Sequence, residues 1–106
     1  MSKKFNYGFS INKIGKQGKI NAKANKEIDK LFDAHDIRHC EVGLPGCQGT
    51  FALTRCHRHK RYWYYGQPEK LWDYKQVVCA CTSCHSWLET SHQLTEETFQ
   101  RIRGDE

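Results

Sequence analysis

Residues 76–89 read QVVCACTSCHSWLE, a run of small apolar residues that leads into a Cys-x2-Cys pair. The two adjacent valines favour a short strand over residues 75–80, and a helix is expected to follow over residues 82–91. Cys81 and Cys84 have the spacing at which a tight turn can aim two thiolates at one metal ion. The segment therefore predicts a strand, a metal-binding turn and a helix in direct succession.

Two further cysteines can complete a tetrahedral metal site with this pair. Cys40 and Cys47 lie in the loop HCEVGLPGCQG, residues 39–49, whose glycines make a wide six-residue spacer feasible. Disulfides are disfavoured in a reducing compartment, so cysteines that cluster with histidines are read as metal ligands. A structural zinc ion held by Cys40, Cys47, Cys81 and Cys84 is the expected outcome.

Cys56 and Cys79 are left over, each inside a predicted strand. Cysteine packs as a small hydrophobic residue, so we expect both to lie in the core. The alternative is that Cys79 replaces Cys81 in the zinc site, because alternate residues of a strand share a face.

The segment FALTRCHRH, residues 51–59, has the composition of a strand. Alternation along this strand would place His57 and His59 on one side. Basic side chains surround the two histidines, and their charge would attract the phosphates of a nucleic acid. The expected nucleic-acid contacts are Arg55, Arg58, Lys60 and Arg61.

The predicted helix adds a second set of reactive side chains. His85 and Glu89 are four residues apart, a spacing that projects both from one helical face. A strand histidine together with this pair supplies what phosphodiester hydrolysis requires, namely a general base and a divalent metal ion. Imidazole and carboxylate ligands suit Mg²⁺, Mn²⁺ or Zn²⁺, so the sequence does not select the catalytic ion.

Several of these features together resemble the HNH nucleases, especially small phage-type members. They are HRHK on a strand after a cysteine-bearing loop, a carboxamide at the start of the last strand, and CTSCHSWLE; the resemblance covers residues 40–92. It implies an α+β fold with a small ββα-metal (His-Me finger) core, a separate structural zinc ion, and flanking N- and C-terminal helices. It also implies that His57 is the general base, that Gln76 takes the place of the central asparagine, and that His85 binds the catalytic metal.

The sequence departs from the family pattern at three places. Cys56 precedes His57 where many relatives have a metal ligand, so His59 is expected either to bind the catalytic metal or to act as the base. The central asparagine is replaced by Gln76, whose longer carboxamide is expected to orient the base, the alternative being that Gln76 is a surface strand residue. Glu89 stands where relatives have a second helical histidine and is expected to bind the catalytic metal, with His92 about one turn further as a reserve.

The rest of the chain is expected to frame this core. Residues 1–21 are predicted to be a basic arm with a short strand at 5–11, and residues 22–36 an amphipathic helix. A last helix is expected to begin at residues 94–97, where a threonine is followed by two acids. Residues 22–106 would then form a single nuclease domain.

Aromatic residues gather between the two predicted strands. In a domain with few apolar residues they are expected to anchor packing, and the alternative is that they stack on nucleobases. They are Tyr62, Trp63, Tyr64, Tyr65 and Trp72.

The charge of the chain is concentrated in its first part. Residues 1–30 carry eight lysines and two acids, whereas the net charge of the whole chain is +5. The chain contains neither an apolar run long enough to cross a membrane nor the apolar run of a secretory signal, which favours a cytoplasmic protein. The resemblance to small phage-type HNH members implies that it is phage-encoded in a bacterial host.

The sequence as a whole predicts a metal-dependent HNH endonuclease that cuts or nicks DNA with low intrinsic specificity. It would act alone, as a homodimer or within a larger phage nucleoprotein complex. A zinc-stapled nucleic-acid adaptor without hydrolytic activity is the alternative. A third hypothesis is a phage regulatory protein that binds a host factor.

Overall fold

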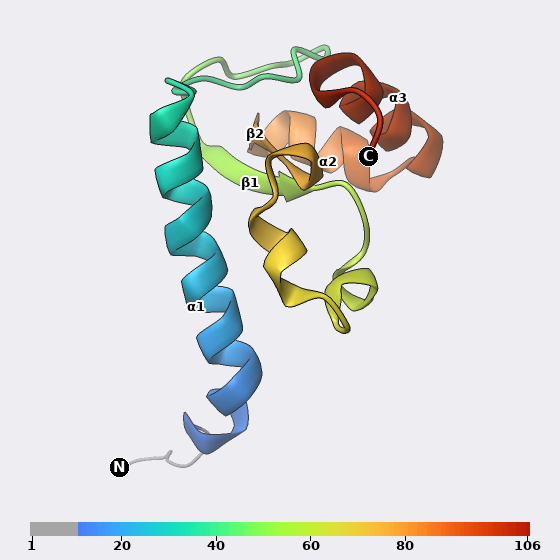
Figure 1. Ribbon diagram of the computed structural model, residues 1–106. Coiled ribbons are helices and arrows are strands. Elements are labelled where there is room, and N and C mark those ends of the chain that lie inside the picture. The colour runs from blue at the N-terminus through green and yellow to red at the C-terminus, as the bar shows by residue number, and fades with distance from the viewer. Residues whose placement is uncertain (1–10) are drawn as a thin grey trace, which may run out of the picture.

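The computed structural model describes the backbone of residues 11–106 and the side chains of residues 17–106. Within these residues it contains one long helix, a two-stranded sheet and two shorter helices, as Figure 1 shows. The expected α+β class is confirmed at this level. The elements are α1 (Ile11–Ala34), β1 (Leu53–His57), the 3-10 helices η2 (Arg61–Tyr64), η3 (Pro68–Trp72) and η4 (Tyr74–Gln76), β2 (Val77–Cys81), α2 (Thr82–Glu89) and α3 (His92–Arg103). In the described part of the chain, no helix combines the length and the apolar character needed to cross a membrane.

The two strands form an antiparallel pair in which His57 lies opposite Val77. Every residue of β2 is buried, because one face packs on Ile28 and Phe32 of α1 and the other packs on α2 and α3. A strand that is covered on both faces needs apolar side chains throughout, which explains the sequence VVCAC. Since β2 passes directly into α2, the strands and the helix follow one another as a β-β-α unit.

The long helix begins earlier than the sequence indicated. Residues 1–21 were expected to be an irregular arm, but α1 already starts at Ile11. Two glycines, Gly15 and Gly18, disfavour a helix and obscured this start, although the intervening lysine and glutamine residues favour one. The strand expected at residues 5–11 lies outside the described residues except for Ile11, which is helical.

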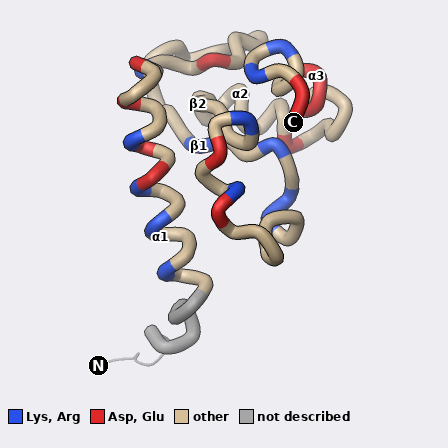
Figure 2. The backbone as a smooth tube through the Cα atoms, viewed as in Figure 1, with Lys and Arg blue, Asp and Glu red and all other residues tan. Residues whose placement is uncertain are grey.

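The buried face of α1 follows the predicted amphipathic pattern. Its members recur every four residues along the helix, and they are Ala24, Ile28 and Phe32. The helix ends after Ala34, where Asp36 adopts a positive φ of 54° and the backbone N–H of Ile37 donates to the carbonyl of Phe32 at 2.8 Å. Figure 2 shows lysines along α1, with acidic residues among them from Glu27 onward.

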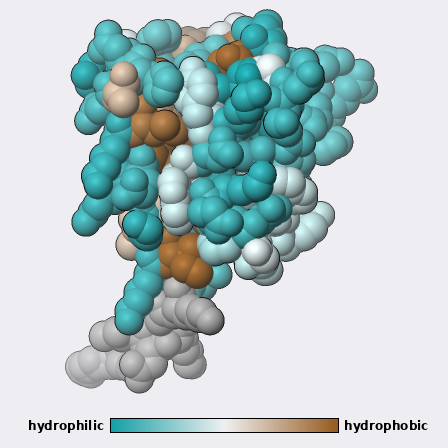
Figure 3. All heavy atoms as spheres, in the orientation of Figure 1, coloured by the Kyte–Doolittle hydropathy of each residue, from teal (hydrophilic) through white to brown (hydrophobic). Residues whose placement is uncertain are grey.

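The last helix also begins earlier than expected. Ser91 caps α3 by accepting a hydrogen bond from the backbone N–H of Leu94 at 3.1 Å. Thr95, which was expected at the cap, lies inside the helix and donates to the carbonyl of Leu88 at 2.7 Å. Phe99 of α3 is fully buried against the sheet, so this helix closes the core on the side opposite α1. The face in Figure 3 is mainly hydrophilic, with hydrophobic residues confined to small separate areas.

A buried ion pair joins the cysteine-bearing loop to α3. Arg103 donates to both carboxylate oxygens of Glu41 at 2.7 and 2.8 Å, and only 1% of the arginine side chain is exposed. The backbone N–H of Glu41 donates to the carbonyl of Cys79 at 2.8 Å, and the backbone N–H of Cys79 donates to the carboxylate of Glu41 at 2.9 Å. The loop thus satisfies the edge of β2 that lies away from β1.

We expect Glu41→Gln to lower the free energy of unfolding by about 2 kcal/mol, because it leaves the buried Arg103 guanidinium without a counter-charge. Urea unfolding followed by circular dichroism measures this difference. Glu69→Gln, at an exposed site in η3, is the matched control and should leave the stability unchanged. Equal stabilities of the two variants would contradict the structural role of this pair.

Candidate metal centre and adjoining cleft

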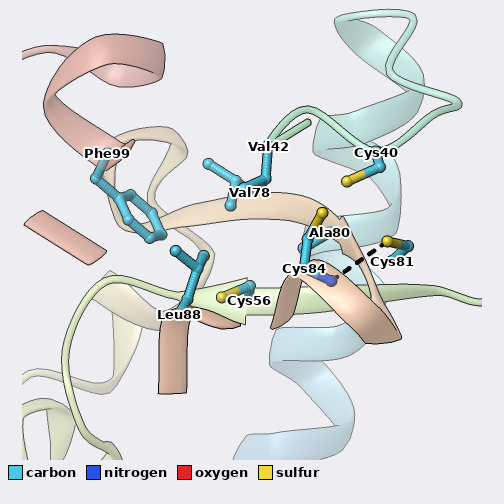
Figure 4. Close-up of a cluster of buried hydrophobic side chains, with 9 residues drawn as sticks. All are labelled: Cys40, Val42, Cys56, Val78, Ala80, Cys81, Cys84, Leu88 and Phe99. Atoms are coloured by element: carbon cyan, nitrogen blue, oxygen red, sulfur yellow. Dashed lines mark hydrogen bonds between the residues drawn. The ribbon is translucent and has the colours of Figure 1, made fainter. Parts of the chain in front are cut away.

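Four cysteines from separate segments meet at the junction of β2 and α2. Their sulfur atoms all lie within 4.8 Å of one another, and three of the four side chains are buried, as Figure 4 shows for Cys40, Cys81 and Cys84. The four are Cys40, Cys47, Cys81 and Cys84, the set that the sequence predicted. They could hold a structural metal ion.

The alternative in which Cys79 replaces Cys81 is wrong. Cys79 packs in the cluster formed with Ile28 and Phe32 of α1, away from the other sulfurs. Cys81 is the last residue of β2 and caps α2, since its sulfur accepts a hydrogen bond from the backbone N–H of Cys84. The strict alternation of the strand therefore ends at Cys81, where the chain turns toward the metal site.

The loop between Cys40 and Cys47 reaches the site through a compact fold. The N–H of Cys40 donates to the carbonyl of Gly49 at 2.8 Å, and the N–H of Cys47 donates to the carbonyl of Leu44 at 2.9 Å. Gly46 has a φ of +85°, and a Cβ atom there would lie 3.2 Å from Oγ of Ser83. A glycine is required at this point because the loop turns left-handed while it contacts the start of α2.

Backbone N–H donors stabilise the thiolate form of two of the four cysteines. Burial raises the pKa of Cys81, but hydrogen bonds from the N–H groups of Gln48 at 3.3 Å and Cys84 at 3.4 Å outweigh it and lower this pKa to about 6. The pKa of Cys40 is also lowered, because hydrogen bonds from the backbone outweigh the effect of its burial. Thiolates are the form of cysteine that binds a metal ion, so the local hydrogen bonds favour ligation at Cys81 and Cys40. Burial has the opposite effect at Cys84, where it raises the pKa of the thiol to about 12.

Cys56 and Cys79 behave as core residues, as expected. Burial raises the pKa of Cys56 to about 12 and that of Cys79 to about 11, so both thiols stay neutral. They lie on opposite faces of the sheet, because Cys56 belongs to the cluster on the side of Leu88 and Phe99. Neither belongs to the four-cysteine site.

A cleft of about 770 Å³ runs along the free edge of β1. Its walls come from α1 on one side and from α2 and the start of α3 on the other, with η2 at one end. Because the cleft includes this edge, it receives side chains from both faces of the strand. The predicted site residues on its lining include His57, His59, His85 and Glu89.

His85 is held in one tautomer by β1. Oγ of Thr54 donates its only proton to the carbonyl of Ala80 at 2.7 Å, so the hydrogen bond of 2.8 Å to Nδ1 of His85 must be accepted by Thr54. Nδ1 of the neutral ring therefore carries the proton, and Nε2 has the lone pair. Nε2 lies 3.6 Å from a carboxylate oxygen of Glu89. Two donor atoms on one metal ion are roughly 3–3.5 Å apart, so these two are nearly in place to share an ion.

His57 is also held in one tautomer. Its Nε2 lies 2.8 Å from the carbonyl oxygen of Leu71, which can only accept, so Nε2 carries the proton and Nδ1 has the lone pair. Burial lowers the pKa of His57, and the positive charges of Arg61 and Arg55 lower it further, against the effect of the Leu71 hydrogen bond. The ring is therefore neutral at pH 7 and able to accept a proton.

His59 is not placed with His85 and Glu89. Its Nε2 bonds to the carboxylate of Glu106 at 2.7 Å, and its ring stacks on Trp63 with centroids 4.1 Å apart. Among the described residues, the four cysteines form the one group of at least three possible ligand side chains with all ligand atoms so close. The structure therefore does not bring His59 together with His85 and Glu89, and its role as a ligand of the catalytic metal or as the base stays a prediction.

Gln76 does not contact His57 either. Its side chain is buried, accepts a hydrogen bond from the hydroxyl of Tyr64 at 3.0 Å and donates to the carboxylate of Glu106 at 2.8 Å. The ring of Tyr64 in turn packs edge-on against His57, with centroids 5.5 Å apart. The direct orienting role expected for Gln76 is wrong, and the partner of His57 is a backbone carbonyl.

The four predicted phosphate contacts fall into two groups. Arg58 is buried and bonds to Glu96 at 3.0 Å and to the carbonyl of Gly104 at 3.0 Å, so it is a structural residue. Arg55 forms a bidentate ion pair with Asp29 of α1 at 2.9 and 3.1 Å. Only Lys60 and Arg61 of the four are exposed, and both line the cleft.

Thr54, Asp29 and Glu106 were not identified from the sequence, although each fixes a predicted site residue. Their partners lie 26 to 47 positions away in the chain, and nothing in the local pattern indicates the contacts. The exception is Thr54, whose place two residues before Cys56 put it on the face of β1 toward α2. The Leu71 carbonyl has no sequence signal, because every residue has a carbonyl group.

No protein-family model, curated protein or solved structure matches the chain.

Proposed function

We propose that this protein is a metal-dependent HNH endonuclease that hydrolyses phosphodiester bonds in DNA. One observation carries the proposal: His57, whose Nδ1 has a lone pair, lines the same cleft as His85 and Glu89. The order β1, β2, α2 agrees with the ββα-metal core that the sequence resemblance implies. Zinc is the proposed ion at the four cysteines, because it favours tetrahedral sites of four thiolates.

The side chains divide the reaction between them. Nδ1 of His57 would accept a proton from the attacking water, since its ring is neutral and fixed through Nε2. Lys60 and Arg61 would draw the phosphate backbone into the cleft. His85 and Glu89 would hold a divalent ion, which stabilises the charge that develops on the phosphate and the leaving oxygen. A two-residue donor set suits Mg²⁺ or Mn²⁺, because such ions retain several water ligands.

The setting of this activity is part of the same proposal. We also propose a cytoplasmic enzyme of low intrinsic specificity, because Lys60 and Arg61, the exposed cations on the cleft lining, would contact phosphates whatever the DNA sequence. A single cleft would make nicks. A homodimer, or a place in a phage nucleoprotein complex, would bring two clefts to one duplex and allow a double-strand break.

The second candidate is a nucleic-acid adaptor stapled by the four-cysteine site. It is favoured by Cys56, a neutral buried thiol at the position where many HNH relatives carry a metal ligand. The engagement of His59 with Glu106 points the same way. Such a protein would keep the fold and the basic cleft but would not hydrolyse DNA.

Supercoiled plasmid incubated with the purified zinc-loaded protein separates the two candidates. We expect nicked or linear plasmid in the presence of added Mg²⁺ or Mn²⁺. We expect none without an added ion, because zinc bound by the four cysteines is not available to His85 and Glu89 in the cleft. Agarose electrophoresis measures the conversion. Retarded but uncut plasmid under every ion would overturn the nuclease and favour the adaptor.

A further inference from the structure

Four consecutive aromatic residues, Tyr62 to Tyr65, have two different structural roles. Tyr64 is buried and Trp63 stacks on His59, so these two belong to the packing of the domain. Tyr62 and Tyr65, in contrast, are 71% and 62% exposed. Leaving two large rings in water has an unfavourable free energy, and packing within the domain does not explain them.

The two exposed tyrosines lie on one face of a single helical turn. The backbone N–H of Tyr65 donates to the carbonyl of Tyr62 at 3.2 Å, which closes a 3-10 turn. In a 3-10 helix the side chains at positions i and i+3 eclipse one another, with a rise of roughly 2 Å per residue. The two side chains therefore start about 6 Å apart and project in one direction.

This face stands beside the cleft and next to two cations. Tyr62 is on the cleft lining with Lys60 and Arg61, which directly precede it in the chain, whereas Tyr65 lies outside the lining, one 3-10 turn further along. Among the described residues, no salt bridge involves Lys60 or Arg61. Free cations beside exposed aromatic rings form the combination that binds single-stranded nucleic acid, since the cations contact phosphates while the rings stack on bases.

We propose that Tyr62 and Tyr65 form a stacking platform for unpaired nucleobases, so that the strand entering the cleft is single-stranded or locally melted DNA. The proposal rests on the proposed function, because it makes this strand the substrate of the His57 cleft. Bases in a duplex present only their edges, and their faces are already stacked, so a duplex cannot use two rings in this way. The stacking surface therefore selects for unpaired DNA.

Fluorescence anisotropy with a labelled single-stranded oligodeoxythymidine, in the absence of added Mg²⁺ or Mn²⁺, tests the platform without any cleavage. We expect Tyr62→Ala and Tyr65→Ala each to weaken binding about ten-fold or more, and Tyr62→Phe to bind like the wild type because it keeps the ring. The matched control is Phe51→Ala, which removes a ring that is 70% exposed but belongs neither to the turn that carries Tyr62 and Tyr65 nor to the cleft lining. It should bind normally.

An abasic oligonucleotide of the same length identifies stacking as the cause. It keeps the phosphates but offers no base, so the wild type should bind it about as weakly as Tyr62→Ala, and the substitution should have no further effect. Equal affinity of all variants for the thymidine strand, or tighter binding of a matched duplex than of the single strand, would overturn the platform.

Cleavage assays keep the two proposals distinct. If the protein cuts no DNA but the tyrosine variants still lose single-strand binding, the nuclease fails and the platform remains. If the protein cuts DNA and the tyrosine variants bind and cut normally, the platform fails and the nuclease remains.

Discussion

Cys84→Ala is expected to leave the protein unfolded, and a strong zinc chelator is expected to unfold the wild type. The four cysteines join the loop after α1 to the end of β2 and the start of α2, and Cys84 and Cys81 are fully buried in the main core cluster. Binding of a structural zinc ion contributes about 10–16 kcal/mol, whereas the whole stability of a domain is about 5–15 kcal/mol. Without the ion, no metal–thiolate bonds would hold these three segments together. Far-UV circular dichroism before and after chelation measures the loss of structure.

Cys79→Ala is the matched control for this experiment. Cys79 is buried like Cys84 and lies two residues from Cys81, but its thiol packs on α1. The variant should stay folded with a modest loss of stability, since it removes one sulfur atom from the core. Metal analysis should find zinc in the wild type and in Cys79→Ala. A folded, metal-free Cys84→Ala protein would show that the four cysteines do not staple the fold.

The metal centre was predictable because its signal is local. The Cys-x2-Cys spacing and the glycines of the first loop specify turn geometry within a few residues, and a shared ion supplies the long-range contact. The strands and the helix that carry His57 and His85 were predictable for the same reason, since alternation and helical periodicity depend only on neighbours in sequence.

The errors arose where a distant partner decides the role of a side chain. Arg58 has the sequence context of a phosphate contact, yet it is buried because it donates hydrogen bonds to Glu96 and to the carbonyl of Gly104 at the end of α3. His59 and Gln76 both bond to Glu106, which lies 47 and 30 positions away. A strand pattern gives the face of a residue but not the group that covers that face.

His57→Ala is expected to lower the rate of plasmid cleavage by about 10²- to 10⁴-fold while the protein stays folded and zinc-loaded, because general-base catalysis contributes about that much. His57 is a half-buried side chain at the end of β1, and its one described hydrogen bond is to the Leu71 carbonyl. His39→Ala, at an exposed site on the loop, is the matched control and should cut normally.

The pH dependence of cleavage tests whether His57 is the base, because a purely structural residue would not set the pH at which activity falls. The base acts in its neutral form, so activity must fall as the pH drops through its pKa. Burial and the charges of Arg61 and Arg55 lower that pKa, which puts the acid limb below the value of about 6.5 for an ordinary histidine. Arg61→Gln removes one of these charges and should move the limb to higher pH. If Arg61→Gln left the limb in place, or moved it to lower pH, the proton would be accepted by another group and His57 would lose its assigned role.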